Sequence, residues 1–550
     1  MLLTEQSLIY RGIRPLQKLG DLAKLNALLP LAGLAMPQRV PERLRVVPPD
    51  PWAGDAARGR DMMAGIFRFA GQTFEKEEVS WRPATAKAEW MAELHGFEWL
   101  RDLRSVGGDR ARRMARDMVI YWLRHNEKPQ PGLPGWDAES TGMRIAAWIS
   151  FHDFFCASAD DDFRHAWFAS LVKQARYLSK VLPGNLYGIP LMRALKGLAY
   201  SGLALDDGED RLEQAFRMIL REIKMQILPD GGHVSRSPQA TFEFLQCLVD
   251  LRTAVTAARL DLPAELQHAI DKLAPAVKFF RHSDGAFCQF NGGQEGNPNI
   301  CDATLMHSGA RGKAMKSLPH CGYEKIQLGR ASVIMDVGLG GLPKYSARAH
   351  AGLMGFEYGF GKDRVIVNCG TTSVDGKWRD LLKSTAAHST LVVDNRNACH
   401  FDDSGQLTTR PEMTSERRED DHMAEIVASH SGYMPRYGLI HQRSLRLLDA
   451  GETLSGEDML SGKAGAHFAV RFHLHPCIQA SLIQEGGEVL LRARSGIGWR
   501  FSAENAQLSI DDSVYAGEGD TPRRALQIVL SGVSAAPDTR VLWQLKRDKI

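Results

Sequence analysis

The first 300 residues carry apolar side chains at the spacing of amphipathic helices, where every third or fourth position falls on one face. Three segments show this spacing: "STGMRIAAWISFHDFF" (140–155), "RLEQAFRMILREIKMQIL" (211–228) and "SPQATFEFLQCLVDLRTAV" (237–255). Ser140 or Thr141 and Ser237 suit the N-cap position, and Pro238 suits the first turn of a helix. We therefore predict a stacked, all-helical region.

After about residue 320 the pattern changes to short runs rich in β-branched and aromatic residues, bounded by Gly, Asp and Asn. The clearest runs are "ASVIMDVG", "RVIVNCG", "STLVVDN", "RSLRLL", "EVLLRA", "ALQIVLSG" and "HFAVRFHLHP". In the last run, residues 468, 470, 472 and 474 are apolar and share one face of a strand. His473 and His475 lie on the other face, where they would either chelate a metal or be exposed polar residues, and we favour exposure. Many short strands predict a β-sandwich.

The chain has 550 residues, more than one hydrophobic core usually supports. We expect an N-terminal extension (1–50), a helical domain (51–315) and a β-sandwich domain (316–550). The net charge of +3 excludes a broad polybasic surface, so no nucleic-acid partner is expected. The sequence also lacks a P-loop, a GxGxxG turn in a βαβ unit and a GxSxG elbow, which argues against kinases, dehydrogenases and α/β-hydrolases.

The eight cysteines form no CxxC pair, and several lie in apolar runs. Buried free thiols in a reducing compartment are therefore expected. The N-terminus shows no export signal, and its longest apolar stretch, "LNALLPLAGLAM", is too short to span a bilayer. The sequence thus predicts a cytoplasmic protein without a membrane span.

The loop "LPGNLYGIP" (182–190) holds two polar side chains that could contact a ligand, Asn185 and Tyr187. Asn185 either serves the turn, since Asn tolerates turn geometry, or donates its amide to a ligand beside Tyr187.

The stretch "PDGGHVSRSP" (229–238) places His233 and Arg236 just before a predicted helix. These residues are either ordinary loop polars or a cationic pair that grips an acidic ligand, because a helix N-terminus favours anions and Arg binds both oxygens of a carboxylate. Arg144, in the helix that also carries Trp148, either adds to this charge or forms a structural salt bridge.

A third group lies in the strand-rich half and comprises Arg348, His350, Glu357, Asn368 and His388. Two His and an Asn or Asp on neighbouring strands could bind zinc. A hydrogen-bonded structural role is the alternative.

The colinear order of several motifs resembles the heparinase II/III family of bacterial polysaccharide lyases. These motifs are "GWDAESTGMRIAAWI", "GN", "ILPDGGHVSRSP", "ARAHAGLMGFEYG", "VIVNCGT", "STAAHSTLVVD", "YGLIHQRSL" and "FHLHP". The resemblance implies an incomplete α/α toroid followed by an antiparallel β-sandwich. It also implies cleavage of an acidic, uronate-containing or glycosaminoglycan-like polysaccharide by β-elimination, in the periplasm or cell envelope. This chemistry requires no cofactor.

In that chemistry, an Asn, His or Arg neutralises the uronate carboxylate, and a Tyr or His removes the C5 proton. Asn185 and His233 match the family's carboxylate-neutralising Asn and its Asp-Gly-Gly-His histidine. The His that usually follows the Asn is Leu186 here, and the Tyr that usually follows Arg-Ser-Pro is absent.

In the family pattern His-x-His-x-Asp, this chain has Arg348, His350 and Gly352. His350 and His388 match metal-site positions, with Asn368 in place of the carboxylate between them. The resemblance therefore implies a structural zinc held by His350, Asn368 and His388.

The resemblance thus implies a site with six catalytic residues: Asn185, Tyr187, His233, Arg236, Arg348 and His350. Tyr187 or His233 would replace the missing base, and Arg144 and Trp148 would bind substrate. The alternative is a catalytically inactive protein that binds glycans of the capsule or envelope, and the absent Tyr and His favour that alternative.

Overall fold

The computed structural model describes residues 40–75, 81, 83–372, 376–402, 405–519 and 521–548. Most of the predicted N-terminal extension, residues 1–39, lies outside the described residues. The described chain divides into two compact units: residues 223–249 and 264–550 form the second, and the rest forms the first. The last helices before residue 315 therefore group with the strands, although we predicted them as part of the helical domain.

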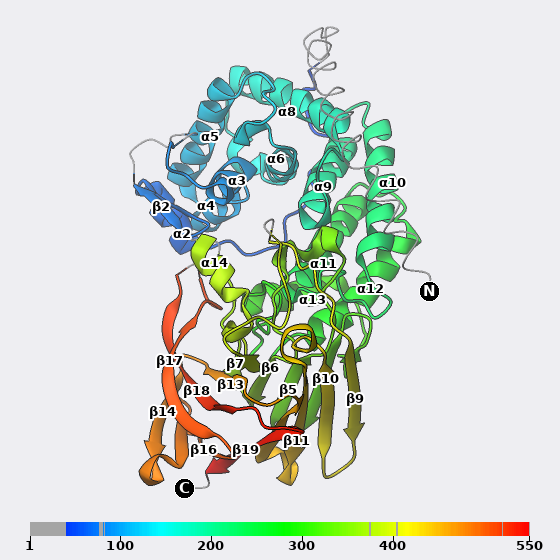
Figure 1. Cartoon of the computed structure of the whole chain (residues 1–550). Coiled ribbons are helices and arrows are strands. Elements are labelled where there is room, and N and C mark those ends of the chain that lie inside the picture. The colour runs from blue at the N-terminus through cyan, green and yellow to red at the C-terminus, as the bar shows by residue number, and fades with distance from the viewer. Residues whose placement is uncertain are drawn as a thin grey trace. The chain divides into compact units, whose positions relative to one another are not determined.

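Helices dominate the described residues up to Ser308 (Figure 1). They are α2 (Ala56–Met63), α3 (Ala88–Gly96), α4 (Leu100–Val106), α5 (Gly108–His125), α6 (Ala138–Ser150), α7 (His152–Cys156), α8 (Asp161–Val181), α9 (Gly188–Ala204), α10 (Glu209–Gln226), α11 (Pro238–Ala257), α12 (Ala264–Phe279) and α13 (Pro298–Ser308). A small hairpin of β1 (Ile66–Phe69) and β2 (Gln72–Glu75) accompanies them. The three predicted helical segments are confirmed.

Helix starts follow the expected capping chemistry, with one correction. The Ser237 hydroxyl accepts the Ala240 N–H, and Pro238 is the first residue of α11, as predicted. The N-cap of α6, however, is Asp137, whose carboxylate accepts the Ser140 N–H at 3.1 Å. The predicted cap at Ser140 or Thr141 is therefore wrong by one turn.

In the first unit, α6 is the central helix, because it contacts α3, α8 and α9. Its core is aromatic: the ring of Trp148 packs edge-on against Phe97 and Trp122, with centroids 5.4 and 5.3 Å apart. Large buried rings supply much of the driving force for packing such a helical layer.

The second half of the chain is built mainly from strands. They are β3 (Ser317–Leu318), β4 (Tyr323–Leu328), β5 (Ala331–Asp336), β6 (Phe356–Phe360), β7 (Asp363–Val367), β8 (Leu391–Val393), β9 (Met413–Glu419), β10 (Ala424–His430), β11 (Leu439–Leu448), β12 (Thr453–Gly462), β13 (His467–Leu474), β14 (Ile478–Ile483), β15 (Glu488–Ala493), β16 (Gly498–Glu504), β17 (Gln507–Tyr515), β18 (Arg523–Val533) and β19 (Asp538–Asp548). Short helices α14 (Gly376–Leu382), α15 (Met434–Tyr437), η2 (Pro343–Arg348) and η3 (Thr385–Ala387) interrupt them.

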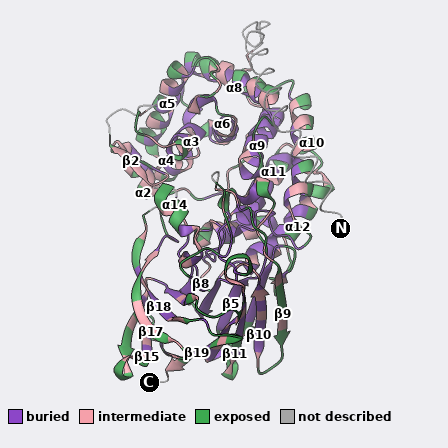
Figure 2. Cartoon of the chain, in the orientation of Figure 1, coloured by how far each residue is buried: buried purple, intermediate pink, exposed green. Residues whose placement is uncertain are grey.

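Two antiparallel sheets form the predicted sandwich among the described residues. One has the order β14-β15-β16-β19-β12-β11-β10-β9, and the other β17-β18-β13-β7-β6-β5-β4-β3, with β8 paired to β13. Figure 2 shows buried residues along the inner strands and exposed residues along the edge strand β9. The helical region followed by antiparallel sheets confirms the predicted fold class.

Every second residue of β13 is apolar and packs into the core of the sandwich. Its residues Phe468, Val470, Phe472 and Leu474 are all buried in the main apolar cluster, as predicted. Trp543 from β19 packs on Phe472 at 4.7 Å. The opposite residue, Gly456, leaves room for that indole, because a Cβ there would lie 2.0 Å from the ring.

The face of β13 that we expected to be exposed is also covered. His473 is buried and contacts the Ala386 carbonyl at 2.9 Å through Nε2, while His475 is buried near Glu295. The prediction of exposed histidines is therefore wrong, because the segment before β8 covers this face. All eight cysteines are free, and all but Cys477 are buried. Within the described ranges, no helix is both long and apolar enough to cross a bilayer.

Candidate functional site

The loop between α8 and α9 presents two of the predicted site residues to solvent. Asn185 and Tyr187 are both exposed, whereas Leu182, at the start of the loop, is buried. Gly184 and Gly188 adopt positive φ angles of 50° and 65°, which glycine tolerates best. The loop thus brings an amide and a phenol, two positions apart, to the N-terminus of α9.

The structure contradicts the predicted substrate contacts of α6. Arg144 and Trp148 are both 0% exposed. The Arg144 guanidinium donates to Gln174 Oε1 at 2.7 Å and to the His95 carbonyl at 2.9 Å, and it lies 4.0 Å from the centre of a Trp122 ring. Through these contacts Arg144 links neighbouring helices. Because it is fully buried, it cannot contact a polysaccharide.

The "PDGGHVSRSP" stretch forms a clamp inside the second unit. The Asp230 carboxylate accepts N–H groups from Gly232, at 3.2 Å, and from His320 and Cys321, at 2.7 and 2.8 Å. The turn before α11 is thereby fixed to the chain that enters β4.

His233 is enclosed by this turn and cannot act as the predicted base. It is 2% exposed, with Nε2 at 2.8 Å from Gln226 Oε1 and Nδ1 at 2.7 Å from Ser235 Oγ. Burial, helped by the charge of Arg348, lowers the His233 pKa to about 3. An imidazole with so low a pKa is a weak proton acceptor, and both ring nitrogens already have partners.

Arg236 has a structural role as well, which contradicts its predicted grip on a carboxylate. It is 5% exposed, and its guanidinium donates to the carbonyls of Cys321, at 2.7 Å, and Gly322, at 3.2 Å, and to Asp336. Its backbone has a φ of 63°, a strained value for a residue with a side chain. Asp336 neutralises the charge, so little remains for a substrate.

Arg348 differs from Arg236 in being accessible. It is the last residue of η2, its side chain is 48% exposed, and its nearest carboxylate, Glu243, lies 3.9 Å away. Such an exposed ion pair is weak. Arg348 is therefore the predicted cation that remains able to contact an anionic sugar.

His350 and His388 come together in the second unit, as the resemblance implied. His350 Nδ1 and His388 Nε2 are 3.1 Å apart, and both rings are buried. Burial lowers the His388 pKa to about 4 and the His350 pKa well below its usual value. Both imidazoles are therefore neutral at physiological pH.

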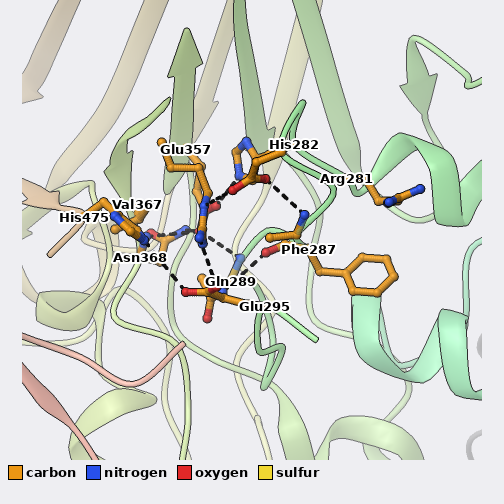
Figure 3. A network of polar contacts seen from close by, with 12 residues as sticks. Arg281, His282, Phe287, Gln289, Glu295, Glu357, Val367, Asn368 and His475 are labelled. Atoms are coloured by element: carbon orange, nitrogen blue, oxygen red, sulfur yellow. Dashed lines mark hydrogen bonds and ion pairs between the residues drawn. The ribbon is translucent and has the colours of Figure 1, made fainter. Parts of the chain in front are cut away.

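A second buried polar network surrounds Glu357 (Figure 3). Glu357 Oε1 accepts N–H groups from Gln289 and Asn368, at 2.8 and 3.1 Å, and Oε2 lies 2.7 Å from His282 Nε2. Asn368 is thus held by a carboxylate, and the set lacks a third ligand for zinc. No group of three or more His, Cys, Asp or Glu side chains within the described ranges could hold a metal ion.

Sequence reasoning missed His282, Asn291 and Asp336, which complete these networks. Asn291 donates to Tyr323 at 2.6 Å and accepts the His350 N–H at 3.0 Å. The available signal was an acidic residue at the end of an apolar run, as in "ASVIMD". Such a residue needs a buried partner, but the partner is far away in sequence.

In the first unit, Asn185 and Tyr187 remain accessible, and in the second unit Arg348 does, whereas the other predicted residues are committed to packing. An amide can donate to a carboxylate, a phenol can exchange a proton, and a guanidinium can bind an anion. Such groups suit an acidic ligand.

A helical region followed by two antiparallel sheets is the fold of heparinase III. That crystal structure aligns with a TM-score of 0.74 and 15% identity over 95% of this chain and 89% of its own. Heparan sulfate lyase HepC from Pedobacter heparinus aligns with a TM-score of 0.59 and 15% identity, covering 90% of this chain and 83% of its own.

Residues 56–308 match the Heparinase II/III N-terminus family, and residues 310–544 match the Heparinase II/III-like C-terminal family. The chain therefore belongs to the heparinase II/III family and has a polysaccharide lyase fold. A relative is "FtsZ-localized protein C" of Caulobacter vibrioides, 30% identical over 536 residues, which covers 94% of this chain and 92% of the relative.

Proposed function

We propose that this protein is a polysaccharide lyase that cleaves a uronate-containing glycan by β-elimination, with Asn185 and Tyr187 as its catalytic residues. The observation that carries the proposal is their joint exposure on one loop of a heparinase II/III family member. His233 and Arg236, the other candidates for these roles, are enclosed.

The proposed reaction needs only these two side chains in the first unit. The Asn185 amide donates to the uronate carboxylate and stabilises the enolate-like charge that develops when the C5 proton leaves. The Tyr187 phenolate accepts that proton and passes it to the C4 oxygen as the C4–O bond breaks, which regenerates the phenolate. The N-terminus of α9 adds partial positive charge beside the carboxylate. The products are a new reducing end and a sugar with a C4–C5 double bond.

The test is the ultraviolet absorbance of unsaturated uronate ends after incubation with a panel of uronate polysaccharides. Tyr187→Phe and Asn185→Ala should each lower turnover by about 100-fold or more, the usual size of such contributions. Tyr437→Phe, a half-buried tyrosine in α15, serves as the matched control and should keep full turnover. Equal activity of Tyr187→Phe and the unaltered protein would remove Tyr187 from the mechanism.

A second candidate is a glycan-binding protein without catalysis, which works on envelope polysaccharide. The enclosure of His233, Arg236 and His350 favours it, since these residues match the family motifs yet have no open face. In this case Arg348 would supply a charge-assisted contact, and Arg348→Met should weaken glycan binding about tenfold. Calorimetry with the same panel distinguishes the candidates: binding without unsaturated product supports the second one.

The name of the Caulobacter relative suggests where such a role would be exercised. We propose that this chain also localises with FtsZ. A fluorescent fusion imaged together with labelled FtsZ tests this, and a signal that never coincides with FtsZ would contradict it.

A further inference from the structure

The direct contact between His350 and His388 lies where the family resemblance implies a metal. The two imidazoles meet at 3.1 Å, nearly perpendicular to each other, with ring centroids 5.2 Å apart. A hydrogen bond between them requires one nitrogen to donate and the other to accept.

The tautomers of this pair follow from the neighbouring backbone. His388 Nδ1 lies 2.8 Å from the Ser384 carbonyl, which can only accept, so Nδ1 carries the hydrogen. A neutral His388 then has its lone pair on Nε2, and His350 Nδ1 must donate to it. The hydrogen of His350 therefore points to the place where a metal ion would sit.

Asn368, which replaces the family carboxylate, is turned away from a ligand role. Its Nδ2 donates to Glu357 Oε1 at 3.2 Å, and its Oδ1 accepts the Ser389 N–H at 3.0 Å. Rotating the amide would place its oxygen against the Glu357 carboxylate. An aspartate at this position would face the same repulsion unless a cation balanced its charge.

The second family carboxylate is missing as well. Gly352 takes the Asp position of His-x-His-x-Asp, and a Cβ there would lie 2.4 Å from His388 Cδ2. The absence of a side chain lets the His388 ring approach the chain at this position.

Direct hydrogen bonds also join the two segments that a metal would link. The Ala351 N–H donates to the Lys383 carbonyl at 2.8 Å, the Thr385 hydroxyl donates to the Ala351 carbonyl at 2.7 Å, and the Thr390 hydroxyl donates to the Leu353 carbonyl at 2.9 Å. A metal cross-link is therefore not needed to hold them.

We infer that this protein has replaced the metal of its family with a direct His350–His388 hydrogen bond, and that Asn368 keeps the site free of metal by its bond to Glu357. The exchange is chemically consistent, because zinc requires deprotonated nitrogen ligands, and a hydrogen-bonded imidazole pair offers only one lone pair at that point.

Metal analysis and thermal unfolding of the full chain test the inference. The purified protein should contain far less than one equivalent of zinc, and neither a chelator nor added zinc should shift its Tm. Asn368→Asp should lower the Tm by several degrees without metal, bind about one equivalent of zinc, and regain stability with it. His467→Ala, an exposed histidine in β13, is the matched control for His388→Ala.

Stoichiometric zinc in the unaltered protein that is lost in His388→Ala and kept in His467→Ala would overturn the inference. Failure of a folded Asn368→Asp variant to bind zinc would overturn the role given to Asn368. If that variant does not fold, the metal content of the unaltered protein decides the question alone.

Discussion

At the scale of single residues, two arginines that were both predicted as catalytic residues have opposite environments. Arg236 and Asp336 form an ion pair in which both side chains are 6% exposed. The Arg348 side chain is 48% exposed, and its guanidinium is 3.9 Å from the Glu243 carboxylate, which makes a loose, exposed pair. Breaking a buried pair leaves an uncompensated charge in a medium of low polarity, while water screens an exposed one. The sequence shows two arginines near turns and cannot reveal this difference.

Arg236→Met should lower the free energy of unfolding by about 3–5 kcal/mol, because Asp336 keeps a buried charge without its partner. Arg348→Met, the matched control, should change it by less than about 1 kcal/mol. Urea unfolding followed by tryptophan fluorescence measures both. Equal effects of the two substitutions would contradict the roles assigned here.

At the scale of elements, the turn that begins "PDGG" illustrates what a sequence can and cannot predict. Its Pro, Asp and Gly residues predict a turn, and Ser237 with Pro238 predicts the start of α11; the helix start is confirmed. The role of Asp230 could not be predicted, because its partners His320 and Cys321 lie about ninety residues later. Local residues determine where a turn or helix begins, whereas residues far away in the sequence determine which groups it contacts.

Removing the clamp should destabilise the second unit. Asp230→Ala leaves the N–H groups of Gly232, His320 and Cys321 without their acceptor, and the two buried donors, Gly232 and Cys321, cost about 1–3 kcal/mol each. We expect a total loss of about 3 kcal/mol, and a smaller loss for Asp230→Asn, which keeps one acceptor. Asp421→Ala, at an exposed turn, is the control and should unfold at the urea concentration of the unaltered protein.

At the scale of the whole molecule, apolar periodicity predicted the order of helices and then strands. It also predicted the inner face of β13, because burying one face of each element drives folding. The candidate site was less predictable, since burial depends on contacts between distant segments. Arg236 meets Asp336 a hundred positions away, and His473 is covered by the chain at Ala386. Because of these contacts, residues that we predicted to bind a ligand have structural roles instead.

The buried histidines make the stability of the molecule depend on pH. Burial lowers the pKa of His233 and of His473 to about 3 and that of His388 to about 4, against about 6.5 in an unfolded chain. Between pH 6.5 and pH 4 the unfolded state therefore binds more protons than the folded one, so stability falls as the pH falls. Each histidine should lower the free energy of unfolding by about 2 kcal/mol at pH 5 relative to neutral pH.

Urea unfolding at pH 7.5, 6 and 5 should show this decline in the free energy of unfolding. His473→Gln should make the decline less steep, because glutamine takes up no proton. A free energy of unfolding that stays constant over this range would show that these imidazoles are not held neutral by burial.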